Sequence, residues 1–144
     1  MYSLLLQTHS ILRYLILAVL LIVLFRSVIG HLAKRQYETF DNQSSLLLLM
    51  LVHIQFAIGI VLYIVSPIVK AALADMGAAM KDEALRFAAV EHVTVMLLAV
   101  IAITVGRVWS KKAKLDDMKH RRSLICYAVG FVLIIAGIPW EKMF

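Results

Sequence analysis

Four long apolar segments alternate with short polar segments along the chain. The apolar segments cover about residues 4–29, 46–69, 85–108 and 123–140. Each is close to the ~20 residues that a helix needs to cross ~30 Å of hydrocarbon at ~1.5 Å per residue. Because these segments take up most of the chain, no water-soluble domain remains. The pattern predicts an all-α integral membrane protein, a single transmembrane domain over residues 1–144 folded as a four-helix up-down-up-down bundle.

The composition places the chain outside the class of soluble globular domains. Hydrophobic residues make up 62% of the 144 residues and charged residues only 17%, whereas soluble domains average about half and a quarter. The single cysteine, Cys126, excludes an internal disulfide framework and any metal site built from several cysteines.

Positive charge is concentrated beside the first and third loops, and this asymmetry predicts the orientation. Ten of the 15 Lys and Arg residues lie there: Arg26, Lys34, Arg35, Arg107, Lys111, Lys112, Lys114, Lys119, Arg121 and Arg122. The opposite side carries the other five, with acidic residues such as Glu141 among them: Arg13, Lys70, Lys81, Arg86 and Lys142. This distribution predicts a multi-pass protein of the inner (cytoplasmic) membrane with both termini outside the cytoplasm. The basic cluster is explained by contact with anionic lipid of the bilayer, and no nucleic acid partner is expected.

The segment between the second and third spans has mixed character. Apolar residues alternate irregularly with charges over residues 70–87. Such a pattern is typical of a short amphipathic helix that lies on the membrane surface, and we expect one at the outer face.

Small residues recur at helical spacing in the last two spans. The positions at this spacing are Ala88, His92, Val95, Ala99, Ala102 and Gly106 in the third span, and Cys126, Gly130, Leu133 and Gly137 in the fourth. Most of these residues are small. Small residues mark the faces where membrane helices pack closely. The same stripe would equally leave room for a flat cofactor, and the sequence does not separate these two uses.

Histidines supply the candidate chemistry. Four of them lie in or at the edges of the spans at two approximate depths: His9 and His92 nearer the outer face, His53 and His120 nearer the inner face. Ionisable groups inside a membrane are costly and usually face an interior site. In a four-helix square, the first and third spans are diagonally opposite, as are the second and fourth. This is the arrangement in which a haem is held between two axial imidazoles.

Other interpretations of these polar residues remain open. Each histidine could instead hydrogen-bond to a neighbouring helix, and His31 is expected to be a loop-edge residue. Arg13 has three candidate roles: pairing with Glu91, binding a haem propionate, or extending to the interface. A zinc or copper site is not expected, because it requires three close ligands and the histidine depths spread too widely.

Several segments resemble a family of small four-helix membrane proteins from Bacteroidetes that are labelled cytochrome b-like. The resemblance lies in THSILRYLIL, HIQFAIGIVLYIVSP, VEHVTVMLLAVIAITVGR, KHRR and the terminal IPW, and covers nearly the whole chain. More loosely, the first-span histidine is similar to that of small haem-binding membrane protoporphyrinogen oxidases, although this chain lacks their expected transmembrane lysine. The resemblance implies b-type haem, with His9, His53, His92 and His120 matching the motif histidines.

The leading hypothesis is a membrane-bound b-type haem protein that passes electrons between a quinone and a partner. One haem is expected at His9 and His92, with Arg13 near its propionates. A second haem at His53 and His120 is an extension of this hypothesis. The alternatives are a non-catalytic accessory subunit of a larger respiratory or secretion complex and a proton-conducting bundle; either allows association with other membrane subunits or with copies of the chain. Whether the protein has enzymatic turnover is left open.

Overall fold

The computed structural model describes residues 1–140. Over these residues the chain forms helices and no strands. The elements are α1 (Tyr2–Ala33), α2 (Thr39–Val65), α3 (Pro67–Ala74), α4 (Met76–Ala79), α5 (Glu83–Arg86), the π-helical turn η1 (Phe87–Glu91), α6 (His92–Lys112) and α7 (Asp116–Gly137). Glu141 and Lys142, which entered the charge comparison, lie outside the described residues.

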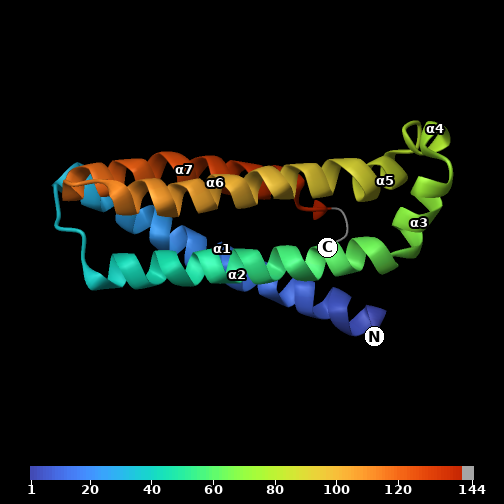
Figure 1. Cartoon of the computed structure of the whole chain (residues 1–144), viewed down its shortest axis with the longest axis horizontal. Helices are drawn as coiled ribbons and strands as arrows, with labels where there is room; N and C mark the ends of the chain where they lie inside the picture. Colours follow the sequence, from blue (N-terminus) through green and yellow to red (C-terminus); the bar gives the residue numbers. More distant parts are fainter. Residues whose placement is uncertain (141–144) are drawn as a thin grey trace.

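Four long helices run antiparallel to one another and form the predicted bundle (Figure 1). α1 packs against α2 and α7, and α6 packs against α7 and α2. α1 and α6 are therefore one diagonal pair, and α2 and α7 are the other. The four-helix fold is confirmed. All four helices, the third taken as the continuous stretch Glu83–Lys112, are long and apolar enough to cross a membrane.

The two ends of the bundle differ in construction (Figure 1). The N-terminus, the end of α7 and the short helices α3 to α5 lie at one end, called here the terminal end. The α1–α2 and α6–α7 connections lie at the other, called here the loop end. By the charge asymmetry described above, the loop end is the one predicted to face the cytoplasm.

The second membrane helix ends earlier than the apolar pattern predicts. α2 ends at Val65 rather than Val69, because the residue before Pro67 is forced out of the helical region. Ser66 has φ −67° and ψ 127°, and its Oγ accepts a hydrogen bond from the Val69 backbone N–H, which caps α3. The prediction of one amphipathic helix over residues 70–87 is wrong in detail, since three short helices occupy this region.

At the loop end, α2 begins before the predicted apolar span because polar residues cap its first turn. Glu38 and Asp41 form a capping box at the start of α2. Each carboxylate accepts a hydrogen bond from the backbone N–H of the other residue. Asp41 Oδ1 also accepts a hydrogen bond at 2.6 Å from Arg26 Nε on α1. Asp41 thus fixes both the start of α2 and its contact with α1.

Replacing Asp41 with alanine should therefore destabilise the bundle. The variant loses a helix cap and leaves the partly buried Arg26 without its closest partner, a combined cost of about 2–3 kcal/mol. Reversible unfolding in mixed micelles measures this change. The matched control is Glu38→Gln, which keeps the capping acceptor and loses only an exposed 3.5 Å ion pair; its expected cost is below about 1 kcal/mol. Equal costs for the two variants would contradict this account of Asp41.

Close packing between α6 and α7 follows the predicted stripe of small residues. A Cβ at Gly106 would lie 2.7 Å from Cys126 Cβ, one at Gly130 would lie 2.9 Å from Ile103, and one at Gly137 would lie 2.7 Å from Met96. The glycines therefore let the two helices approach closely. In the middle of the bundle, Leu20, Leu48 and Ile103 are fully buried and form an apolar layer.

Candidate cofactor site

A cavity of about 410 Å³ lies inside the terminal half of the bundle. Residues of α1, α2, α3, η1, α6 and α7 line it. Most of the lining is apolar, and the polar side chains that line it include His9, Arg13, Gln55, Tyr63 and His92. A volume of this size with a few convergent polar groups is typical of a small-molecule or cofactor site.

His9 and His92 face each other across this cavity. They come from α1 and α6, which are diagonal helices, and their ring centroids are 6.4 Å apart with an interplanar angle of 74°. The structure thus brings together the two histidines that the sequence placed at a similar depth. The Nδ1 atom of His9 is buried and has no hydrogen-bond partner among residues 1–140, so no neighbouring helix orients the ring through that atom.

The His92 ring is oriented by contacts with the backbone and with an aromatic side chain. Its Nδ1 lies 2.7 Å from the carbonyl oxygen of Gly137 at the end of α7. Since a carbonyl only accepts, Nδ1 carries the proton in the neutral ring, and the lone pair resides on Nε2. Phe87 packs on the same ring, with centroids 5.6 Å apart. This is the arrangement by which proteins orient a metal-binding imidazole.

A π-helical turn leads directly into His92. η1 covers Phe87–Glu91 and is the only such turn among residues 1–140. One extra residue per turn shifts the side chains that follow it around the helix axis, and such insertions occur frequently at functional sites. Here the turn places both Phe87 and His92 on the cavity wall.

Three buried polar atoms on the cavity wall have no hydrogen-bond partner: His9 Nδ1, Arg13 Nε and Gln55 Oε1. The amide nitrogen of Gln55 is satisfied, because it donates to the His9 carbonyl oxygen at 2.8 Å. Leaving a buried polar atom unpaired costs about 1–3 kcal/mol. A ligand in this cavity would therefore gain stability by satisfying these three atoms.

The structure does not bring His53 and His120 together. His53 is exposed on the outer surface of α2, where Nε2 lies 3.0 Å from Thr104 Oγ1 of α6. His120 is 1% exposed and packs against Gly30 of α1 and the ring of Tyr37. These two rings therefore face different neighbours, and the sequence-based pairing of His53 with His120 has no geometric counterpart.

Four further polar residues, three of which were considered in the sequence analysis, have identified contacts. Glu91 pairs with Arg86 at 2.7 Å rather than with Arg13. The Tyr63 hydroxyl donates to the Ala89 carbonyl oxygen at 2.7 Å, and the guanidinium of Arg13 lies over the Tyr14 ring. His31 pairs with Asp117 at the loop end. Among the candidates, Arg13 is thus left available to the cavity.

Two features of the site were not predicted from the sequence. The Gly137 carbonyl that orients His92 is a backbone group, so no side-chain pattern indicates it. Phe87 lay in the stretch interpreted as a surface helix, whereas it lines the cavity. Pro67, which ends α2, was the sequence signal that could have indicated the position of Phe87. The chain that follows this proline folds back over the terminal end.

No family model, curated protein or solved structure matches this chain. Fold and site therefore define the class: a four-helix bundle whose helices can span a membrane, with a cavity between the helices and two neighbouring imidazoles on its wall. Residues 1–140 contain no group of three or more His, Cys, Asp or Glu that could hold a metal ion. A haem needs only two protein ligands, because the porphyrin supplies the rest.

Proposed function

We propose that the chain is a b-type haem protein of the inner membrane that passes electrons between a quinone and a partner, with His9 and His92 as the axial ligands. The observation that carries the proposal is the 6.4 Å separation of the two ring centroids. A metal–imidazole bond of about 2.0 Å, plus about 1.1 Å from the nitrogen to the ring centre, places two trans imidazole centroids about 6.2 Å apart.

The side chains around the two histidines suit the same ligand. Arg13 Nε and Gln55 Oε1 are unpaired polar atoms beside an apolar cavity. A guanidinium is well suited to a carboxylate such as a haem propionate. The Gly137 carbonyl holds His92 in the tautomer that presents Nε2.

The ligand set determines the kind of chemistry. A bound haem supplies reversible one-electron transfer. His9 and His92 would hold the haem through their ring nitrogens, and the mostly apolar lining would favour electron carriage over binding of an external ligand. Because His53 and His120 lie apart, the proposal is limited to one haem.

A visible spectrum of the detergent-purified protein, expressed with haem supplementation, tests the proposal. We expect an alpha band of reduced b-type haem after dithionite treatment, no spectral change on addition of carbon monoxide, and partial reduction by a short-chain quinol. A colourless protein that copurifies stoichiometrically with other membrane subunits would overturn the proposal in favour of an accessory subunit.

Arg13→Gln should weaken haem binding without abolishing it. The variant loses the cationic group that faces the cavity but keeps both imidazoles, and we expect about a tenfold loss of haem affinity, in line with the effect of a supporting residue at a metal site. Haem titration of the apoprotein measures this. Lys70→Gln, an exposed cation on α3 at the same end of the bundle, is the matched control. Equal affinities of the Arg13 variant and wild type would remove Arg13 from the site.

A further inference from the structure

A second group of buried polar side chains lies in the loop-end half of the bundle, away from the cavity. His120, Ser123 and Tyr127 are spaced three and four residues apart, so they share one face of α7. They are 1%, 2% and 0% exposed. Each has one buried polar atom without a hydrogen-bond partner: His120 Nε2, Ser123 Oγ and Tyr127 OH.

The facing helices also present polar groups at this level. Arg107 of α6 donates to the Asn42 carbonyl oxygen, to Asn42 Oδ1 and to Ser45 Oγ, at 2.8–3.0 Å. Ser45 and Ser110 are each 1% exposed. The Tyr127 hydroxyl lies beside Ser45 and Arg107. The interior of the loop-end half is therefore polar, whereas the layer of Leu20, Leu48 and Ile103 in the middle of the bundle is apolar.

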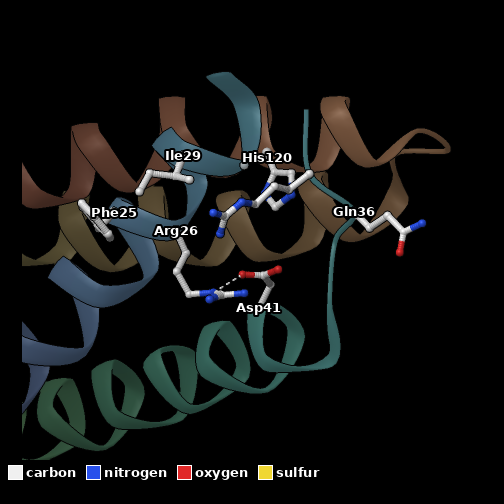
Figure 2. A pocket seen from close by; sticks show the side chains of 8 residues that line it. Phe25, Arg26, Ile29, Gln36, Asp41 and His120 are labelled. Atoms are coloured by element: carbon white, nitrogen blue, oxygen red, sulfur yellow. Dashed lines mark hydrogen bonds and ion pairs between the residues drawn. The ribbon is translucent and has the colours of Figure 1, made fainter. Parts of the chain in front are cut away.

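Two small cavities are lined in part by His120. The larger, about 50 Å³, is also lined by Arg26, Arg35, Gln36 and Asp41. In Figure 2 the Arg26–Asp41 pair lies beside the His120 ring at the α1–α2 connection. The smaller cavity, about 10 Å³, is lined by hydroxyl-bearing residues that include Ser45 and Ser123. His120 and Asp41 line both.

Three cations lie around His120: Arg26 and Lys119, which have identified partners, and Arg35, which lines the larger cavity. Arg26 is paired with Asp41 and Glu38, and the Lys119 ammonium lies over the Tyr37 ring. Tyr37 packs on the His120 ring with centroids 5.3 Å apart. Burial raises the pKa of the Tyr37 phenol, so it stays protonated at neutral pH. The groups around His120 are thus hydrogen-bonding groups, paired ions and the Arg35 cation, without the set of anions that a bound metal cation would need.

We propose that the loop-end half of the bundle binds ordered water, which links His120 and the buried hydroxyls of Ser45 and Ser123 to the loop-end aqueous phase. A buried water needs a cavity of about 10–15 Å³ and two to four polar partners. The smaller cavity meets both conditions, and the larger one holds further waters towards the α1–α2 connection. The unpaired nitrogen and hydroxyl oxygen provide the hydrogen-bonding groups that these waters require.

The apolar layer sets the depth of this hydrated region. On α2, Val52 lines the terminal-end cavity, Leu48 belongs to the layer and Ser45 belongs to the polar group. Successive members are about one helical turn apart, or roughly 5 Å. Water that enters from the loop end therefore reaches to within about two helical turns of the terminal-end cavity. The apolar layer of Leu20, Leu48 and Ile103 separates this water from that cavity. This inference does not depend on haem binding.

Water-edited NMR on protein with ¹⁵N-labelled histidine in lipid bilayers tests the proposal directly. His31, half-buried at the loop end, is the water-exposed reference, and His53, exposed on the outside of α2, is the lipid-facing reference. We expect magnetisation from water to reach the His120 ring at a rate closer to that of His31. A rate closer to that of His53 overturns the proposal.

The sign of a stability change gives an independent test. If water pairs with Ser123 Oγ, Ser123→Ala breaks a hydrogen-bonded network and should lower the thermal midpoint by about 3 °C. If the site is dry, the same change removes an unpaired hydroxyl and leaves the midpoint unchanged or raises it, which overturns the proposal. Ile125→Ala, on the exposed face of the same helix, controls for the general cost of substituting α7.

Discussion

Replacing His92 with alanine is expected to lower the haem content of the purified protein at least tenfold, to about the background level. The substitution removes one of the two proposed haem ligands, whose ring is held by the Gly137 carbonyl at 2.7 Å. Changing a residue that only supports a metal ligand costs about 10–100-fold in affinity, and loss of a ligand itself should cost more. The measurement is the ratio of Soret to protein absorbance after haem-supplemented expression.

A matched control separates this effect from misfolding. His53→Ala changes another histidine within a predicted span, but His53 is exposed on α2 and contacts Thr104 rather than the cavity. It should keep the full haem content. Exogenous imidazole should partly restore the spectrum of the His92 variant, because it fills the space left by the ring. Full haem retention in the His92 variant, or loss in the His53 variant, would contradict the assigned ligand pair.

Gly30→Ala should produce the largest loss of stability among the glycine positions. The atoms Cγ, Nδ1 and Cε1 of the His120 ring lie where a Cβ at Gly30 would be placed. Rotation about the Cβ–Cγ bond leaves Cγ in place, and the buried side chain is 1% exposed, with little space for another rotamer, so α1 and α7 have to separate. Overpacking of this kind costs typically 1–3 kcal/mol, and we expect about 2 kcal/mol in reversible unfolding.

Gly77→Ala is the matched control for Gly30→Ala. A Cβ at Gly77 would meet only Asp75 Oδ1, at the ordinary contact distance of 3.5 Å. Because Gly77 is helical and alanine has the higher helix propensity, this change should leave stability the same or raise it slightly. A Gly30 variant as stable as the Gly77 variant would show that His120 does not pack tightly against α1.

The arrangement of the spans was predictable because bilayer thickness and backbone hydrogen bonding dictate it. The helix ends were less predictable. Asp41 lies outside the apolar run, yet its hydrogen bonds to Glu38 and Arg26 extend α2 towards the loop end. Similarly, Pro67 redirects the chain over the terminal end, where an apolar count alone continues the span to Val69.

The site was predictable only in part. Similar depth on diagonal helices was enough to propose that His9 meets His92, and the structure places their rings 6.4 Å apart. Depth alone failed for His53 and His120, because a depth does not define which side of a helix a residue occupies. His53 faces outward and His120 faces inward, and only the packing of α2 against α6 and of α7 against α1 reveals this.

The most direct test of the central claim is the number of haem groups per chain, measured by pyridine haemochrome assay on the purified wild-type protein. Binding between His9 and His92 predicts one b-type haem per chain. A value near zero after haem-supplemented expression would contradict the account, as would a value near two, because the structure provides one facing pair of imidazoles within residues 1–140.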